Sequence, residues 1–422
     1  MAKLSRVPVA VPTRIRKNVR NLTTTELNQV RKGYELMYSL NAQDDYRSYC
    51  KWAGYHGIPD HFCPHGNQRF LTWHRAYMYG MENTMGQLLG DPSFALPYWD
   101  WTSQVSQNEG IPKAYTDTTY VDKDGNTKPN PLLTAIKCYD GTQTTRRPGA
   151  PPFLGFLETM VSAAINNTNS YDEFNARIEQ PHNSLHGWVS GDMGAIDTAA
   201  YDPVFYAHHC NVDRQWWQWQ QKNPGVNPED LDVTLTPWNM QVKDVLTTNQ
   251  LGYVYAAATI IPLSPTQRGV ATALPALNQH LSNFKAKDLE KDFSNARLEL
   301  HDVSLSIPTF KLHVFLNTPS ANEKTPTENN PNYAGSYYFF GKSAGCTGGQ
   351  GHCNPPQPGD DNLVRTNHMS SFNANIDITT CLKGICKSNK TVDVNLVGVD
   401  YQGKPVQLDK LDLGNIGIVL ED

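Results

Sequence analysis

The chain has 422 residues, carries a formal net charge of −5 at pH 7 and contains 18% charged residues. This length allows one large domain or two smaller ones, and the lack of basic runs argues against nucleic acid or an anionic membrane as a partner. No apolar stretch approaches the ~20 residues that a membrane-spanning helix needs. Residues 1–17 lack the long apolar segment and the cleavage site of a signal peptide, which favours a cytoplasmic location. Nothing in the sequence indicates the oligomeric state.

The N-terminal part begins with a helical pattern. Thr23 and Glu26 have the spacing of a capping box, and an apolar stripe follows them, so a helix is predicted there. Glycines and a proline surround His56, which places this histidine in a loop or at a helix end. Another helix is predicted over residues 68–90, with His74 on its apolar face.

A long excursion over the surface is predicted for residues 103–155. Pro, Gly, Thr and Asp are frequent in this segment, and residues 123–126 have a turn sequence. Two shorter helices are predicted near residues 153–166 and 170–178.

Two further helices carry histidines. Pro181 suits the first position of one helix, on which His182 and His186 lie one turn apart on the same face. The other begins at the Asp-Pro pair at 202–203 and carries a His-His pair at 208–209. Adjacent residues point about 100° apart around a helix, so these two rings cannot face one metal equally.

The C-terminal third follows a different pattern, in which apolar and polar residues alternate in runs separated by turn signals. This pattern predicts an antiparallel β-sandwich. The runs are 297–307, 309–317, 334–341, 373–382, 390–400 and 415–422. A connector is expected over residues 259–292. The predicted fold class is therefore α+β, with a mainly helical domain over residues 1–275 and a β-sandwich domain over residues 276–422.

Four of the eight cysteines form two local pairs in this last third: Cys346 with Cys353, and Cys381 with Cys386. Spacing alone leaves disulfides and reduced thiols equally open.

Histidines indicate the chemistry. One set comprises His56, His65 and His74, and a second set lies between residues 182 and 209. Zinc sites of the structural type favour thiolates, and hydrolytic zinc or non-haem iron usually includes a carboxylate ligand. Two sets of imidazoles without such partners favour a pair of coppers. A zinc hydrolase and a scatter of unrelated histidines are the alternatives, and the second explains residues such as His61.

Several motifs carry a resemblance to a known family. They are HG-P, C-x-H-G, F-x-x-W-H-R, PYWDW, PHNSLHGWV and DPVFYAHHCNVDR, and they lie in this order within residues 16–256. Together they resemble the two copper-binding regions of the type 3 copper family, which contains tyrosinases, catechol oxidases and molluscan hemocyanins. The resemblance implies a four-helix bundle around two copper ions, with O2 as co-substrate and small phenols as substrates. The C-terminal third resembles, more loosely, a lid domain over the entrance of such a site.

The resemblance also assigns the metal ligands. The first copper would be bound by His56, His65 and His74. The second copper would be bound by His182, His186 and His209, which leaves His208 a packing role. Cys63 resembles the cysteine that forms a thioether crosslink with the middle histidine of the first set, His65; a free buried thiol is the alternative.

Other positions near the second set correspond to substrate-handling residues of the family. Glu179 and Asn183 would hold a water that takes the proton of an incoming phenol. The alternative for Glu179 is a favourable charge near a helix N-terminus. Gly187 would lie at the substrate entrance and leave the approach open, and Ala195 and Ile196 would lie near the pocket wall.

Further assignments concern residues around the site. Asp213 is expected to orient imidazoles, and Tyr253 and Tyr255 are expected to contact an N-terminal arginine, Arg16 or Arg20, through cation–π interaction. Cys210 stands where the family commonly has a small residue.

The resemblance implies a latent polyphenol oxidase of the tyrosinase type, which ortho-hydroxylates monophenols and oxidises o-diphenols to o-quinones. Phe339 or Phe340 of the lid would fill the pocket in place of a substrate, although sandwich core is the simpler interpretation of both. A catechol oxidase without monophenolase activity and a hemocyanin-like O2 carrier are the other candidate functions.

Overall fold

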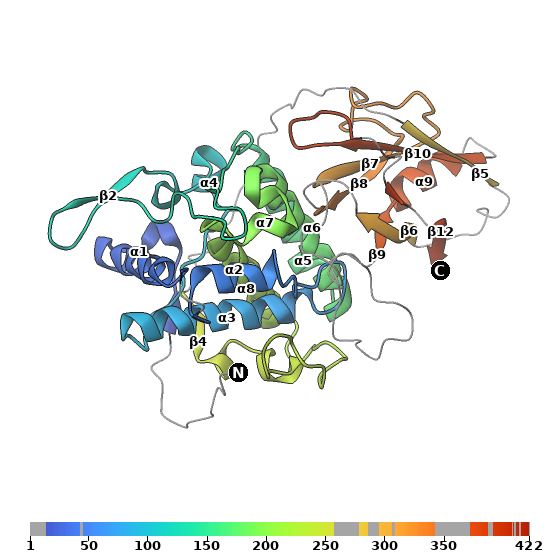
Figure 1. Cartoon of the computed structure of the whole chain (residues 1–422). Coiled ribbons are helices and arrows are strands. Elements are labelled where there is room, and N and C mark those ends of the chain that lie inside the picture. Colours follow the sequence, from blue (N-terminus) through green and yellow to red (C-terminus); the bar gives the residue numbers. More distant parts are fainter. Residues whose placement is uncertain are drawn as a thin grey trace.

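A computed structural model describes residues 14–42, 45–256, 278–285, 295–305, 309–341, 372–386, 391–406, 408, 411–412 and 415–421. A mainly helical N-terminal part is followed by a smaller C-terminal part of antiparallel sheets (Figure 1). The predicted order of a helical and a β part is confirmed. The predicted boundary at residue 275 lies outside the described residues. None of the described helices is long and apolar enough to cross a bilayer.

The helical part packs around one apolar core that includes residues of α1, α3, α6 and α8. Thr23 and Glu26 form the predicted capping box at the start of α1, and α3 ends at Gly90, whose φ of +67° suits glycine. Its helices are α1 (Thr24–Ser39), α2 (Tyr49–His56), α3 (Phe70–Leu89), α4 (Gln104–Glu109), α5 (Phe153–Asn166), α6 (Tyr171–Val189), α7 (Ile196–Ala199) and α8 (Val204–Lys222).

The helix α6 differs from its prediction. The sequence predicts that one helix ends near residue 178 and that another begins at Pro181, but α6 is continuous and contains Pro181 in its interior. A proline inside a helix removes one backbone hydrogen bond. Almost every residue from 178 to 189 is buried, and this packing holds the helix together across the proline.

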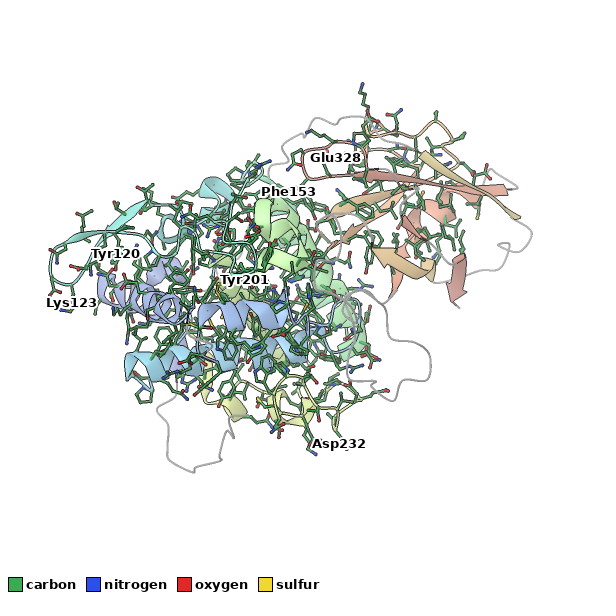
Figure 2. All side chains as sticks on the ribbon, in the orientation of Figure 1. Tyr120, Lys123, Phe153, Tyr201, Asp232 and Glu328 are labelled. Carbon is green, nitrogen blue, oxygen red and sulfur yellow. A yellow bond between two sulfur atoms is a disulfide. The ribbon has the colours of Figure 1, made fainter. Side chains whose placement is uncertain are left out.

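The excursion over residues 103–155 carries short elements of its own. A hairpin of β2 (Thr119–Val121) and β3 (Thr127–Pro129) encloses the predicted turn, and it projects from the helical part beside the labelled Tyr120 and Lys123 (Figure 2). A disulfide between Cys50 on α2 and Cys138 on the excursion joins segments 88 residues apart. No motif around these two cysteines predicts this bond.

The C-terminal part contains two antiparallel sheets whose side chains share one apolar cluster. One sheet has the order β5-β10-β7-β8, and in the other β6 pairs with β9, β11 and β12. The strands are β5 (Asn278–Lys285), β6 (Asn295–Leu305), β7 (Phe310–Leu316), β8 (Tyr333–Phe339), β9 (Phe372–Asp377), β10 (Thr391–Val399), β11 (Leu411–Asp412) and β12 (Asn415–Glu421).

Two predictions for this part were wrong. Residues 278–285 form β5 and do not belong to a connector. The run 373–382 stops being a strand at Asp377 and continues as α9 (Thr379–Cys386), where the Asp377 carboxylate accepts a hydrogen bond from the Thr379 backbone N–H. For Cys381 and Cys386 the sequence left a disulfide and reduced thiols open, and both cysteines lie on α9 as free thiols. Cys346 and Cys353 lie outside the described residues.

Candidate metal centre

Four helices of the N-terminal part bring the histidines together. His56 is the last residue of α2 and His74 lies on α3, which packs against α8. His182 and His186 lie one turn apart on α6. His65 is different, because it lies in the loop between α2 and α3.

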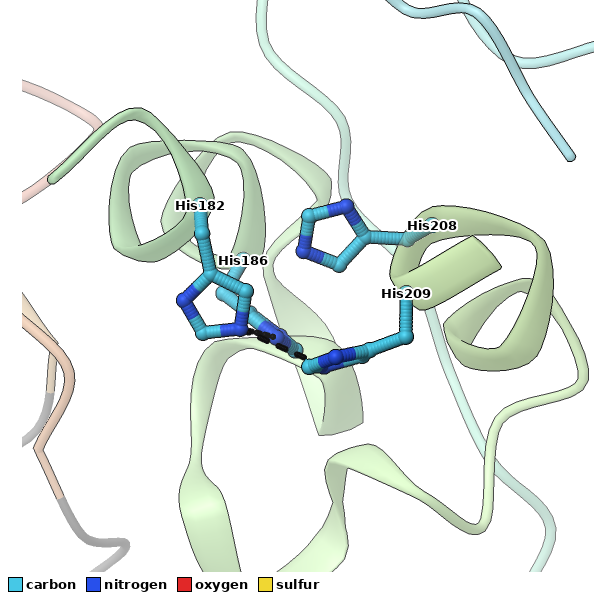
Figure 3. A group of neighbouring side chains, drawn as sticks. All are labelled: His182, His186, His208 and His209. Atoms are coloured by element: carbon cyan, nitrogen blue, oxygen red, sulfur yellow. Dashed lines mark hydrogen bonds between the residues drawn. The ribbon is translucent and has the colours of Figure 1, made fainter. Parts of the chain in front are cut away.

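The second histidine set is closely spaced (Figure 3). The Nε2 atom of His182 lies 3.1 Å from Nε2 of His186 and 3.2 Å from Nε2 of His209. Two nitrogens that bind one tetrahedral metal, each about 2.0–2.1 Å from it, are roughly 3.3 Å apart. Both distances are therefore close to the spacing of two ligands on a single ion.

His208 also lies in this group, with its ring centroid 5.0 Å from that of His182. Of the adjacent pair, His209 is the one that also belongs to a group with His56 and His74, and its ring stacks on that of His74 at 4.4 Å. His209 therefore lies where the two sets meet, whereas His208 lies beside Trp101.

The first histidine set is more open. Its ring centroids lie 5.2–5.5 Å apart, and the sulfur of Cys63 belongs to the same group as the rings of His56 and His65. His65 also faces His182 across the centre, with 5.7 Å between ring centroids. All six predicted ligands thus converge on one region.

Hydrogen bonds orient several of these rings. The Nδ1 atoms of His74 and His186 lie 2.7 Å from the Phe70 carbonyl oxygen and 2.8 Å from the Met193 carbonyl oxygen. A carbonyl accepts, so Nδ1 carries the proton and Nε2 keeps its lone pair for a metal. Within the described part of the chain, Nε2 of His74 and both ring nitrogens of His56 are buried without a hydrogen-bond partner. These atoms fit metal ligands.

Burial keeps the rings neutral. It lowers the pKa values of His74 and His186 to about 3, and it lowers those of His56, His182 and His209 well below the ordinary value. Neutral imidazoles without carboxylates among them suit copper. The residues present therefore fit two copper ions.

Comparison with known proteins decides the family. The sequence model for the common central domain of tyrosinase matches residues 46–222, a range that contains all six histidines. These residues carry the central domain of the type 3 copper family. The histidine clusters match the dinuclear copper site of that family.

The relatives include hemocyanins and a polyphenol oxidase. Hemocyanin 2 of Megathura crenulata is 31% identical over 239 residues, which cover 51% of this chain and 7% of the hemocyanin. The chloroplastic polyphenol oxidase of Malus domestica is 28% identical over 329 residues, or 65% of this chain and 54% of that protein. The chain thus spans only a small part of the long hemocyanin that it matches.

A solved structure shares the fold. A functional unit of octopus hemocyanin covers 96% of this type 3 copper protein and 99% of its own chain, with 22% identity and a TM-score of 0.63. This likeness includes both the helical and the β part.

Glu179 and Asn183 lie beside the centre, but both are engaged. Glu179 Oε1 accepts a hydrogen bond from the Gly66 backbone N–H at 2.7 Å, next to His65. Burial raises the pKa of Glu179 to about 8, against the lowering effect of that hydrogen bond, and two cations nearby would oppose the rise. The Asn183 side-chain Nδ2 donates to the Tyr338 carbonyl at 3.0 Å.

Cys63 is fully buried and its S–H donates to the His56 carbonyl at 3.1 Å. Burial raises the pKa of this thiol well above its usual value. The structure places it within reach of His65 and not in a disulfide.

Two aromatic residues of the C-terminal part have separate positions. Phe339 stacks on Phe310 within the apolar cluster of the β part. Phe340 points the other way and belongs to the helical core, where its ring stacks on His186 at 4.1 Å between centroids. It also lies 5.3 Å from His65 and 5.9 Å from His182.

The position of Gly187 differs from the expectation of an open approach. A Cβ atom at this glycine would lie 1.7 Å from Cε2 of Tyr401, so the tyrosine ring fills the space next to α6. Ile196 is buried, and its backbone N–H donates to the Gly341 carbonyl at 3.2 Å. Ala195 is buried beside it.

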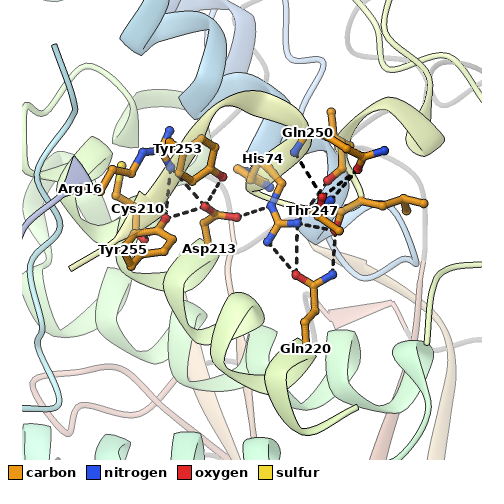
Figure 4. A network of polar contacts seen from close by, with 12 residues as sticks. Arg16, His74, Cys210, Asp213, Gln220, Thr247, Gln250, Tyr253 and Tyr255 are labelled. Carbon is orange, nitrogen blue, oxygen red and sulfur yellow. Dashed lines mark hydrogen bonds and ion pairs between the residues drawn. The ribbon is translucent and has the colours of Figure 1, made fainter. Parts of the chain in front are cut away.

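Asp213 lies in a buried polar network (Figure 4), and its contacts differ from the predicted contacts with imidazoles. Its carboxylate contacts Arg16, Arg75 and the hydroxyls of Tyr253 and Tyr255, and no imidazole contact is described. Burial opposes ionisation, but the two guanidinium groups lower the pKa of Asp213. Asp213 therefore links residues near the start of the helical part with residues near its end, and it does not orient the metal ligands.

Arg16, and not Arg20, is the arginine of this network. Its guanidinium lies over the Tyr253 ring at 3.7 Å, and β1 (Arg14–Arg16) pairs in parallel with β4 (Tyr253–Tyr255). Cys210 lies on the same side, where its carbonyl accepts the Tyr255 hydroxyl. Burial raises the pKa of the Cys210 thiol to about 12.

Three contacts of the centre have no signal in the sequence. They are the Met193 carbonyl on His186, the Tyr401 ring on Gly187 and a buried hydrogen bond between His61 and Asp197. Each joins residues that local periodicity does not relate. The left-handed backbone of His61, with φ of 48°, has no signal in the sequence.

Proposed function

We propose that this type 3 copper protein is a latent polyphenol oxidase with tyrosinase activity. It would ortho-hydroxylate monophenols and oxidise o-diphenols to o-quinones, with O2 as co-substrate. Its helical part would act as a four-helix bundle around the coppers, and its C-terminal β-sandwich would act as the lid. Two copper ions, when bound by the six histidines, would supply the redox chemistry that activates dioxygen.

The observation that supports an aromatic substrate is the stacking of Phe340 on His186 at 4.1 Å. A benzene ring thus fits against an imidazole of the second set. A phenol has the same ring, so it would occupy this place once Phe340 withdraws. Phe340 then explains latency, because substrate and lid compete for one position.

Neighbouring contacts hold the lid closed. Asn183 donates to the Tyr338 carbonyl, and the Tyr338 N–H donates to the Gln180 side chain at 3.0 Å. The Tyr401 hydroxyl donates to the Asn183 carbonyl at 3.3 Å. The bonds of Tyr338 tie the end of β8 to α6, the helix that carries His182 and His186, and the bond of Tyr401 ties the segment after β10 to the same helix.

Opening of the lid would free the side-chain N–H of Asn183 for its role with Glu179, while its Oδ1 stays 2.9 Å from Nδ1 of His182. The two side chains would hold a water that accepts the phenol proton, and the buried Glu179 carboxylate would receive it through that water. The neutral imidazoles would keep their positions, and the side chains that line the site would exclude other water.

An oxygen carrier is the second candidate, because hemocyanins are among the relatives and a covered centre suits carriage. A catechol oxidase lacks only the monophenol step. The copper-loaded protein distinguishes these functions when O2 uptake is measured with a monophenol and with an o-diphenol, before and after mild detergent or limited proteolysis.

We expect little uptake at first and uptake with both substrates after the lid is displaced. Reversible O2 binding without substrate oxidation would identify a carrier. Oxidation of the diphenol alone would identify a catechol oxidase and remove the proposed role of Glu179. The Glu179→Gln variant should lose monophenol oxidation about 100-fold and diphenol oxidation much less.

A further inference from the structure

The loop between α2 and α3 positions His65, one of the six predicted metal ligands. It leaves α2 after His56, contains no helix or strand, and brings His65 back to within 5.4 Å of the His56 ring. The other rings of the centre lie on helices. Whatever fixes this loop therefore fixes the position of His65.

Backbone hydrogen bonds fold the start of the loop onto α2. The His61 N–H donates to the Gly57 carbonyl at 2.9 Å, and the Phe62 N–H donates to the Tyr55 carbonyl at 2.8 Å. His61 takes a left-handed conformation with φ of 48°, which is uncommon for residues other than glycine. A side-chain contact accompanies this unusual backbone.

That contact is with Asp197 on α7. Nε2 of His61 lies 3.0 Å from Oδ1 of Asp197, and both side chains are buried, with 1% and 3% of their surface exposed. The backbone of Asp197 also holds the loop, because its carbonyl accepts the Ile58 N–H at 3.0 Å. Gly57 permits this approach, since a Cβ there would lie 2.2 Å from the same carbonyl oxygen.

The segment around Asp197 also contacts the second histidine set. The carbonyl of Met193, four residues earlier, orients the ring of His186. At the far end of the loop, Glu179 of α6 accepts the Gly66 N–H. Two carboxylates from the half of the chain that carries His182 and His186 thus hold the loop that carries His65, one near each end.

We infer that Asp197 and His61 are positioning residues of the metal centre. Their hydrogen bond fixes the loop of residues 57–66 against α7 and so sets the place of His65 relative to the second histidine set. Neither residue is assigned as a metal ligand or contacts a substrate. The inference holds for an oxidase and for an oxygen carrier, so it stands independently of the proposed function.

The test compares variants of the full-length chain. His61→Asn tolerates a left-handed backbone but its shorter amide does not reach Asp197. His61→Gln places an amide N–H near the position of Nε2 and serves as the conservative rescue. Asp197→Leu removes the acceptor. His313→Asn is the matched control, because His313 is a half-buried histidine of β7 that bonds to Ser336 at 2.9 Å within the C-terminal part.

The first measurement is hydrogen exchange of the copper-free chain. We expect peptides covering residues 57–66 to exchange at least ~10-fold faster in His61→Asn and Asp197→Leu, whereas α8 keeps the wild-type rate. His61→Gln should restore most of the protection, and His313→Asn should leave the loop unchanged. Wild-type loop exchange in the first two variants would overturn the inference.

The second measurement is copper titration. In His61→Asn, we expect the affinity for one of the two coppers to fall about 10–100-fold while the other is retained. A uniform loss of protection across all helices, or an equal weakening of both coppers, would also overturn the inference, because it would assign the pair to general stability.

Discussion

The two histidine sets reach the same centre by different means. His182 and His186 lie one turn apart on α6, and His209 lies on α8. In the first set, His65 lies on a loop that side chains from elsewhere must hold. A helix fixes the relative position of residues four apart through its own hydrogen bonds. A loop has no such internal rule, so its histidine depends on tertiary contacts.

This difference also separates the neighbours of the two sets. The C-terminal part contacts α6 through Phe340, Tyr338 and Tyr401. The loop of the first set is held by hydrogen bonds to α7 and α6 of the helical part, and its His65 ring lies 5.3 Å from that of Phe340 between centroids. The second histidine set, all on helices, thus lies against the C-terminal part, and the loop that carries His65 of the first set depends on α6 and α7 for its position.

Removal of a helix-borne ring should have the largest effect. His186→Ala is expected to weaken binding of one copper more than about 100-fold, because a ligand is lost. Alanine is a strong helix former, so α6 and the other copper should be retained. Copper content per chain and far-ultraviolet circular dichroism measure both. Loss of both coppers with an intact helical spectrum would show that the two sets do not act separately.

Removal of the Phe340 ring should have the next largest effect. Phe340→Ala deletes an apolar contact worth about 1.5–3 kcal/mol, which corresponds to a shift of roughly 10–100-fold in lid opening. We expect the rate of diphenol oxidation, measured without protease or detergent, to rise by that factor. Phe339→Leu, in the core of the β part, is the control. It leaves the Phe340 ring on His186, so the rate of diphenol oxidation should not rise. An unchanged rate in Phe340→Ala would show that the contact of Phe340 with His186 does not cause latency.

A methyl group on Gly187 should open the lid to a smaller extent. Gly187→Ala forces the Tyr401 ring to move, and overpacking of this kind costs about 1–3 kcal/mol. The expected result is a roughly 10-fold rise in diphenol oxidation with an unchanged copper content. Gly384→Ala on α9 is the matched control, because a Cβ there meets nothing within 4 Å. Equal rates in the two variants would contradict the contact.

Loss of one hydroxyl should have the smallest effect. Tyr401→Phe keeps the ring against Gly187 but removes a long hydrogen bond of 3.3 Å to the Asn183 carbonyl. We expect at most about a 3-fold rise in diphenol oxidation, since such a bond contributes less than ~1 kcal/mol. A larger rise would mean that the hydroxyl, rather than the ring, holds the lid on α6.

Much of the fold and most of the site follow from local rules. The capping box at Thr23 and the strands from residue 295 onward arise from short-range spacing, which the sequence displays directly. His182 and His186 share a face because of helical periodicity. The order of motifs in the family relates the two sets to each other, and the structure brings all six predicted rings to one region.

Other features depend on contacts between distant residues. Pro181 breaks a local rule inside α6, and burial of the surrounding residues outweighs it. Asp213 was expected to orient imidazoles, but the arginine and tyrosine side chains that compete for its carboxylate come from segments far along the chain. Gly187 was expected to leave the substrate approach open, but the ring of Tyr401, from far along the chain, fills the space beside it.

The bond between Cys50 and Cys138 affects how the protein must be produced. It ties α2, whose last residue is His56, to the excursion of residues 103–155. A disulfide forms only where thiols are oxidised. Recombinant material from a strongly reducing host would carry two thiols there, and these thiols bind copper themselves. Metal loading before oxidation would therefore draw copper to the wrong place, so an oxidising host or a refolding step should precede it.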